Sequence, residues 1–168
     1  GFGKATPCSL ATFRGHLLDM NAEGTEVKGL VFAGKCTHAP IRGEKSVGAT
    51  IEGCSFFGVE HYAIYLNGRR NAIRNCDFRD VHAGAIVIKG GSAKADAPGG
   101  NVVENCRFER ICTLRTGCSS GVIALMGHGN AVRHCEIRDT DEVGIENTGT
   151  CNLIEYNRLY DISREFSD

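Results

Sequence analysis

The chain has 168 residues, a length suited to one domain. Its 19 Lys and Arg residues nearly balance 20 Asp and Glu residues, for a formal net charge of −1. No strong field therefore favours nucleic acid or an acidic membrane surface as a partner. No run of about 18 apolar residues is present, which argues against a membrane-spanning helix. The chain begins without Met and without the regions of a signal peptide, so we expect a processed protein or a piece of a longer parent chain.

A short phrase, Asn-x-Val/Ile-x-x-Cys-x-Phe, returns from one end of the chain to the other. Four copies keep the opening Asn and two looser copies precede them, at 25–32, 49–56, 71–78, 101–108, 130–137 and 152–159. Successive copies begin 22 to 30 residues apart. A period of this size is typical of solenoid proteins, in which each repeat stacks on the next.

Each coil is expected to carry a second regular part besides the phrase. Alternating apolar residues closed by glycine favour short strands, at 62–68, 84–90, 121–127 and 143–149. An aliphatic residue of this part often lies nine residues before the central aliphatic of the phrase, and Leu18 stands in that relation to Val27. We therefore expect residues 1–24 to be an irregular N-terminal part or a first coil, and 25–168 to be the repeat domain, cut in mid-coil.

The repeat predicts an all-β fold, a right-handed parallel β-helix with about six coils of roughly 22–30 residues. Stacked coils pair their backbones about 4.8 Å apart and share one apolar core, and crossovers between parallel strands are right-handed. The last position of the phrase should form an interior stack of Phe32, Phe56, Phe78 and Phe108, followed by Ile137 and Leu159. A helical solenoid competes poorly, because β-branched residues fill the inner positions.

The cysteines follow the repeat rather than a metal-binding pattern. Four of the nine share one position in the phrase: Cys54, Cys76, Cys106 and Cys135. We expect them to form a column of buried thiols that behave as small apolar side chains. The column should begin at Leu30 and end at Asn157, whose amide could hydrogen-bond along a turn. Cys112 and Cys118 lie in an insertion and either form a disulfide bridge in an oxidising compartment or remain thiols.

Because inner positions fill the core, function has to come from outward side chains and loops. Acidic residues gather around the second strands of the C-terminal coils, and we take four as candidate catalytic groups: Asp141, Glu142, Glu146 and Asp168. Carboxylates on neighbouring coils start about one strand spacing apart, comparable to the ~5–5.5 Å separation in retaining glycosidases. Such a pair can divide the roles of nucleophile and acid. The alternative is that these residues are solvated turn residues.

Four further residues are candidates for substrate binding. Tyr65 points outward from its strand, His82 and His128 could contact substrate or exchange protons, and Arg69 could pair with a sugar acid. Each has an ordinary alternative as a surface side chain. Asn147 stands where other coils have Leu or Ile, so it is either hydrogen-bonded inside or marks a local change in packing. No metal or cofactor is expected, because no Asp cluster has the spacing of calcium ligands.

Residues 99–168 resemble secreted right-handed β-helix proteins related to glycoside hydrolases, a pectate-lyase-like group. The stretches that carry the resemblance are 100–108, 129–139 and 152–162. In that group the last phrase continues into Glu-x-x-Asp-x-Gly-Ala-x-Tyr, which begins here as Glu165-Phe-Ser-Asp168. The resemblance implies that Asp168 belongs to the active-site region and that a further acidic residue lies beyond it. The group often has His at the position of Glu142, so the resemblance implies no role for that residue.

Three functions remain open. We favour a secreted or periplasmic glycoside hydrolase that uses paired carboxylates on a polysaccharide or oligosaccharide, present here as a fragment. A polysaccharide lyase is the second hypothesis, with a base or a neutralising cation drawn from Tyr65, Lys89, Arg69 and His82. The third is a non-catalytic adhesin or structural shaft. Insertions at 91–100 and 112–118 count against a shaft, because insertions in repeat folds often form a binding face.

Overall fold

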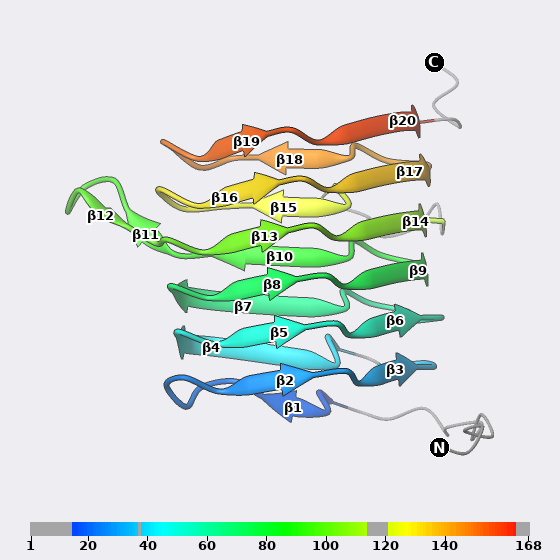
Figure 1. The fold of residues 1–168 in the computed structure, drawn as a ribbon, viewed down its shortest axis with the longest axis horizontal. Helices are drawn as coiled ribbons and strands as arrows, with labels where there is room; N and C mark the ends of the chain where they lie inside the picture. Colours follow the sequence, from blue (N-terminus) through cyan, green and yellow to red (C-terminus); the bar gives the residue numbers. More distant parts are fainter. Residues whose placement is uncertain (1–14, 37, 114–120, 164–168) are drawn as a thin grey trace.

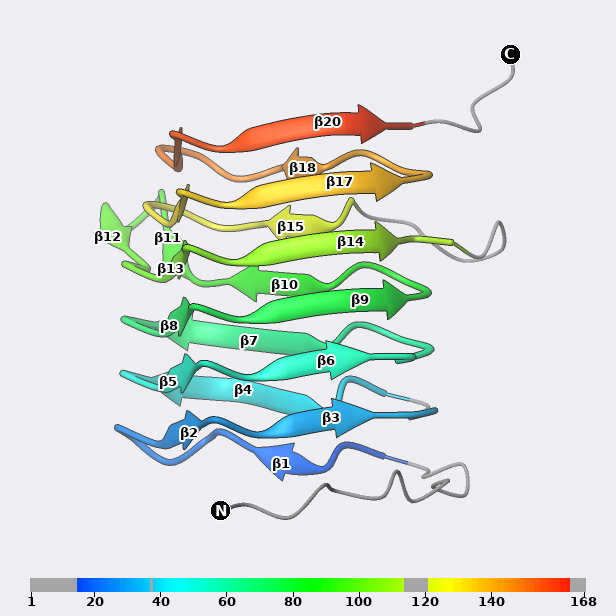
Figure 2. The ribbon, with the colours of Figure 1, turned by 45° about the vertical axis from the view of Figure 1, so that its right-hand side comes forward.

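Three parallel sheets run along the axis of the protein, each contributing one strand to every coil (Figures 1 and 2). The structure is a computed structural model that describes residues 15–36, 38–113 and 121–163. All of its regular elements in these ranges are strands. No helix in the described part of the chain is long and apolar enough to cross a membrane.

The strands of each sheet follow one another in chain order along the axis. The first sheet consists of β1 (Leu18–Asp19), β4 (Ile41–Val47), β7 (Ile64–Arg69), β10 (Ile86–Lys89), β15 (Ile123–Leu125) and β18 (Ile145–Asn147). The second consists of β2 (Glu26–Lys28), β5 (Thr50–Glu52), β8 (Ala72–Arg74), β13 (Val102–Glu104), β16 (Ala131–Arg133) and β19 (Leu153–Glu155). The third consists of β3 (Val31–Ala33), β6 (Ser55–Phe57), β9 (Asp77–Val81), β14 (Arg107–Ile111), β17 (Glu136–Thr140) and β20 (Arg158–Ile162). This arrangement confirms the expected parallel β-helix with about six coils.

The repeated phrase forms two strands in each coil, where the sequence suggested one regular part. A residue with positive φ separates the second-sheet strand from the third-sheet strand in every coil: Gly29, Gly53, Asn75, Asn105, His134 and Tyr156. The left-handed conformation costs Gly nothing and Asn little. We call this column of residues the bend column, because the chain turns there from the second sheet into the third.

The core follows the predicted register. Phe56, Phe78 and Phe108 pair directly across the third sheet, and neighbouring rings in the stack that begins at Phe32 lie 4.7 to 4.8 Å apart. Leu159 was expected to end this interior stack, but it is 43% exposed. It belongs to the last described coil, where no further described strand covers the inner side chains.

The column of thiols is confirmed. Cys54, Cys76, Cys106 and Cys135 are free and at most 2% exposed. Asn157 ends the column as predicted, because its Nδ2 donates to the carbonyl of Val132 and its Oδ1 accepts the N–H of Cys135, both at 2.9 Å. Leu30 differs from the prediction of a buried beginning, since it is 47% exposed at the opposite end. Cys112 is a buried thiol whose Sγ donates to the carbonyl of Ala83 at 3.5 Å, which favours the thiol alternative over the bridge. Cys118 lies outside the described residues.

Buried asparagines form a second column that the sequence analysis did not recognise. Asn71, Asn101 and Asn130 are the opening residues of three phrases, and each is at most 2% exposed. Nδ2 of Asn71 donates to Oδ1 of Asn101 at 2.9 Å, and Nδ2 of Asn101 donates to Oδ1 of Asn130 at 2.8 Å. The amides also accept backbone N–H groups, as Asn101 does from Asn71. This asparagine ladder therefore satisfies polar groups at the turn where each coil leaves the first sheet.

Two departures from the regular coil lie on the first sheet. The insertion at 91–100 forms an antiparallel hairpin of β11 (Gly91–Ser92) and β12 (Ala97–Pro98), which projects from the stack (Figure 1). Strand β4 was missed in the sequence because its register shifts between Gly43 and Ser46. Oδ1 of Asn21 accepts the N–H groups of the two residues in this bulge at 2.8 and 2.9 Å. The second insertion, 112–118, lies largely outside the described residues.

Candidate functional site

The outer side of the first sheet carries one column of residues that holds two of the predicted site residues. Register places the following side chains in line along the axis: Arg42, Tyr65, Val87, Ala124 and Glu146. We call this column the first-sheet face. Three strand spacings separate Tyr65 from Glu146, a distance of about 14 Å at ~4.8 Å per strand. The two residues therefore lie on one face without touching each other.

Tyr65 lies between two cations at the N-terminal half of the first-sheet face. The guanidinium carbon of Arg42 is 5.0 Å from the centre of the ring, and Nζ of Lys89 is 5.2 Å from it. Both distances fall within the range of cation–π attraction. Arg42 is also paired with the carboxylate of Glu44 two residues later. The half-buried phenol ring is thus held in place with a positive charge on either side.

The C-terminal end of the face carries Glu146, and two further carboxylates lie in the loop that precedes its strand. Glu146 lies on β18, is partly buried, and accepts the N–H of Gly121 at 3.2 Å. Asp141 and Glu142 precede β18 in the loop from the third sheet, and both are partly exposed. Oγ1 of Thr140 donates to the carbonyl of Glu142 at 2.8 Å and fixes this turn. The structure therefore gathers three of the four predicted acids on one loop and the strand it enters, whereas Asp168 lies outside the described residues.

The middle of the first-sheet face is buried. Register places Val87 and Ala124 in the outer column, but they are only 4% and 0% exposed. Neither belongs to the apolar core inside the coils. Solvent therefore hardly reaches these two side chains, which lie between Tyr65 and Glu146.

The remaining predicted residues lie along the two edges of the sheet. His82 stands in the loop before β10, where its Nδ1 is 2.9 Å from Oγ1 of Thr113. Arg69 ends β7 at the opposite edge and is exposed. It lines a hollow of about 410 Å³ together with Glu44, Asn67 and Gly90.

His128 is more enclosed than a substrate-binding side chain is expected to be. It is 8% exposed, and its Nδ1 is 2.9 Å from Oγ1 of Thr150 while its Nε2 is 3.7 Å from a carboxylate oxygen of Asp96. These contacts tie the projecting hairpin to the stack. Asn147 is exposed, and its Oδ1 accepts from Nδ2 of Asn152 at 2.8 Å. It is therefore hydrogen-bonded at the end of the ladder rather than inside the core.

The loops between the third and first sheets bring further titratable groups to the edge of the first sheet where His82 lies. His61 stacks on His38 with ring centres 6.5 Å apart. Burial lowers the pKa of His61, and the nearby His38 and Arg42 lower it further. Its imidazole thus tends toward the neutral form, which can donate and accept a hydrogen bond. Glu60 in the same loop is paired with Lys35 at 2.8 Å.

The sequence analysis missed two residues of this site, Arg42 and Glu44. Both belong to β4, whose bulge breaks the nine-residue relation used to locate the other strands. An aliphatic residue ten positions before Ile51 would have been the signal, since Ile41 has that place.

Within the described ranges no group of three or more His, Cys, Asp and Glu residues is arranged to hold a metal ion.

Comparison with known proteins identifies the family but no individual relative. No curated protein and no solved structure matches the chain. Residues 40–165 match the family described as "Right handed beta helix region". This range covers most of the chain and includes β4 through β20. The protein therefore belongs to the right-handed β-helix family.

Proposed function

We propose that the protein is a carbohydrate-active β-helix protein and, more specifically, a glycoside hydrolase that acts on a polysaccharide or oligosaccharide at the first-sheet face. The observation that carries the proposal is the collection of Asp141, Glu142 and Glu146 on one loop and the strand that follows it. Tyr65 lies on the same face, and its phenol hydroxyl can donate a hydrogen bond to a sugar or accept one from it. The proposal includes a secreted or periplasmic location and a longer parent chain.

Hydrolysis of a glycosidic bond needs two carboxyl groups in different roles. Glu146 is the better candidate for nucleophile or base, because the N–H of Gly121 fixes its carboxylate on the sheet. The proton donor to the leaving oxygen is then drawn from Asp141 and Glu142, which lie in the more open turn. Asp168 is proposed as a further member of the site from its place in the sequence repeat and from the resemblance.

A polysaccharide lyase is the second candidate, and one observation favours it. β-Elimination removes the proton next to a uronate group, so it needs a base beside a cation that neutralises the carboxylate. Arg42 and Lys89 flank the Tyr65 ring on both sides. This half of the face therefore carries the residue types that such a reaction uses.

The test is hydrolysis by the parent protein of aryl glycosides and of plant and algal polysaccharides. Glu146→Gln, Glu142→Gln, Asp141→Asn and Asp168→Asn are compared with Glu155→Gln, a matched change on the outer side of the second sheet. We expect release of reducing sugar that Glu155→Gln preserves and at least one of the other variants abolishes. Unsaturated products absorbing in the ultraviolet would support the lyase, and no product from any substrate would support the adhesin or shaft.

A further inference from the structure

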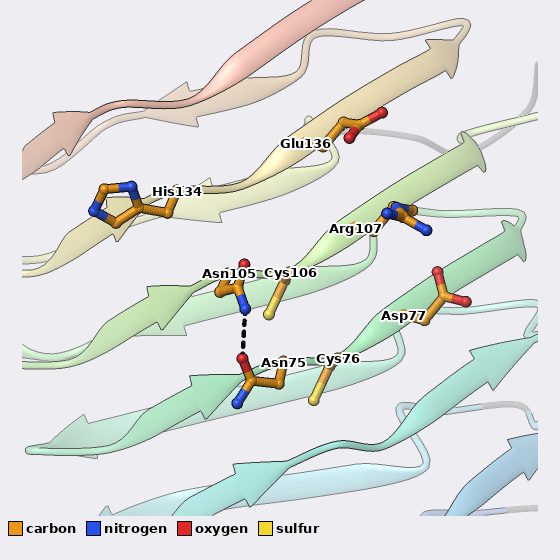
Figure 3. Close-up of a pocket in the computed structure, with 8 residues that line it drawn as sticks. All are labelled: Asn75, Cys76, Asp77, Asn105, Cys106, Arg107, His134 and Glu136. Atoms are coloured by element: carbon orange, nitrogen blue, oxygen red, sulfur yellow. Dashed lines mark hydrogen bonds between the residues drawn. The ribbon is translucent and has the colours of Figure 1, made fainter.

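A second hollow lies away from the first sheet, at the bend between the second and third sheets (Figure 3). Its volume is about 360 Å³. The lining residues come from three successive coils: Asn75, Cys76, Asp77, Asn105, Cys106, Arg107, His134 and Glu136. We call it the corner trough. Figure 3 shows two columns of polar side chains, with the two cysteines between them.

One side of the corner trough is the bend column. Nδ2 of Asn105 donates to Oδ1 of Asn75 at 2.6 Å, and Nδ2 of Asn75 donates to Glu52 at 3.4 Å. The amide series stops at the next coil, because His134 takes the place of Asn. Oδ1 of Asn105 consequently accepts no hydrogen bond within the described part of the chain, and it remains available to a ligand.

The other side consists of the first residues of three third-sheet strands. Asp77, Arg107 and Glu136 are directly paired across β9, β14 and β17, so charges alternate along the axis at about the ~4.8 Å strand spacing. Arg107 is exposed and makes no ion pair with any residue that the structure describes. One carboxylate oxygen of Asp77 contacts Arg79 at 2.9 Å, but its Oδ1 is buried without a hydrogen-bond partner among the described residues.

Glu136 acts as a fixed acceptor. The hydroxyl of Tyr160 donates to its Oε1 at 2.7 Å. This hydrogen bond, followed by the nearby Arg107, lowers the pKa of Glu136. The floor between the two columns offers no reactive group, since Cys76 and Cys106 are each 2% exposed and donate to backbone carbonyls.

A pair of stacked rings extends the trough by one coil. The rings of His134 and Tyr156 lie 5.2 Å apart at an interplanar angle of 9°. Tyr156 follows His134 in the bend column and is 75% exposed. It presents a flat apolar surface directly beyond the polar groups, and aromatic surfaces of this kind pack against the C–H faces of sugar rings.

The chemistry of the corner trough selects among ligand classes. The carboxylates of Asp77 and Glu136 repel a phosphate or sulfate. The positive charge of Arg107, which lies between them, repels a metal ion. Polar groups line most of the hollow, so an apolar ligand gains little there. Hydroxyl groups both donate and accept hydrogen bonds, and they match an alternating series of carboxylates, amides and a guanidinium.

We propose that the corner trough binds a neutral oligosaccharide that lies along the solenoid axis, at a site separate from the first-sheet face. One sugar hydroxyl donates to Oδ1 of Asn105, and others donate to Oδ2 of Asp77 or to Glu136. Arg107 donates to hydroxyl or ring oxygens, and a terminal sugar packs on Tyr156. Such a site holds a polysaccharide on the protein without any part in cleavage.

The test is a nuclear magnetic resonance titration of the isotope-labelled protein with cellohexaose, xylohexaose, mannohexaose and, as an acidic comparison, an oligogalacturonate. We expect at least one neutral hexasaccharide to shift the side-chain amide signals of Asn75 and Asn105. Arg107→Ala and Tyr156→Ala should each weaken that binding at least tenfold. Lys94→Ala, which removes an exposed cation of the projecting hairpin, should leave it unchanged.

Three results would overturn the proposal. These are no shift at Asn75 and Asn105 with any neutral sugar, equal affinity in the wild type and Arg107→Ala, or tighter binding of the oligogalacturonate than of every neutral sugar. Arg107→Gln is included because it keeps more of the side chain if Arg107→Ala fails to fold. Binding is read from spectra and not from cleavage, so the corner trough is tested independently of the hydrolase proposal.

Discussion

Nδ2 of Asn101 donates a hydrogen bond to Oδ1 of Asn130 at 2.8 Å although both side chains are 98% buried. Nδ2 of Asn101 also donates to the carbonyl of Gly68 at 3.0 Å, and its Oδ1 accepts the backbone N–H of Asn71 at 3.0 Å. One side chain thus joins three consecutive coils at their turns. Because a buried polar group without a partner is costly, the asparagine ladder fixes the register of these coils as well as stabilising them.

Replacing the central amide should therefore destabilise the protein strongly. We expect Asn101→Ala to lower the free energy of unfolding by about 3 kcal/mol, since it leaves buried N–H and C=O groups of two coils unpaired. Asn152→Ala, at the less buried end of the ladder, should cost about 1 kcal/mol or less. Urea unfolding followed by circular dichroism measures both. Equal losses of unfolding free energy in the two variants would show that burial does not determine how much a ladder amide contributes to stability.

The ring stack predicts a comparable loss from the apolar core. The ring of Phe78 lies 4.8 Å from that of Phe56 and 4.7 Å from that of Phe108, and Phe78 is fully buried. Phe78→Ala should lower the free energy of unfolding by about 3–5 kcal/mol, through lost burial and the cavity left behind. Phe57→Ala, on the outer side of the same sheet and 44% exposed, is the control and should cost far less. A tolerated Phe78→Ala would contradict a tightly packed stack.

Glu109 on the outer side of the third sheet joins three arginines. Its oxygens lie 2.7 Å from Arg110, 3.0 Å from Arg138 and 3.9 Å from Arg79, and its side chain is 14% exposed. Glu109→Gln should lower the free energy of unfolding by about 1–3 kcal/mol, because three guanidinium groups then lie close together without a central anion. Added salt should narrow the difference from the wild type by screening their repulsion. A loss that is the same at low and high salt would point to packing rather than charge.

The hydrogen bond from Tyr160 to Glu136 predicts a dependence on pH. It lowers the pKa of Glu136 from its ordinary value of 4.5. A carboxylate whose pKa is lower in the folded state stabilises the fold above the unfolded-state pKa, and this contribution is lost as pH falls through the folded-state pKa. Stability should therefore decrease below about pH 4.5, and Tyr160→Phe should reduce the size of that decrease.

A carbon-detected titration of the Glu136 carboxyl checks this directly. Its pKa should rise in Tyr160→Phe toward the ordinary value, and the remaining arginines should prevent a full return. Tyr156→Phe serves as the control, because no hydrogen bond joins Tyr156 to a carboxylate in the described part of the chain. An unchanged pKa in Tyr160→Phe would assign the shift to the arginines instead.

The sequence predicted the fold well and the surface poorly, for a physical reason. Inner positions such as Phe78 and Cys106 repeat because every coil must fill the same interior, so periodicity reveals them. The phrase divides into two strands at a residue with positive φ, such as Asn105 or His134. Because these residues differ in type from coil to coil, the sequence pattern did not reveal the division. Strand β4 was hidden by its bulge at Gly43. Outward side chains do not have to fill a shared interior, so they do not repeat from coil to coil. The cations around Tyr65 and the residues of the corner trough can therefore be recognised only when the strand register is known.

The first-sheet face leads to a final prediction that separates binding from chemistry. If the parent protein hydrolyses a polysaccharide there, Glu146→Gln should lower kcat by about 10²–10⁴-fold, the usual contribution of a group that transfers protons in the transition state. Tyr65→Ala should instead raise KM while changing kcat little, because a ring about 14 Å from Glu146, at ~4.8 Å per strand, contacts substrate away from the cleaved bond. Arg42→Met and Lys89→Met would then follow Tyr65→Ala, since these cations hold the ring. A loss of kcat in Tyr65→Ala with full activity in Glu146→Gln would place the chemistry at the cationic half of the face and favour the lyase.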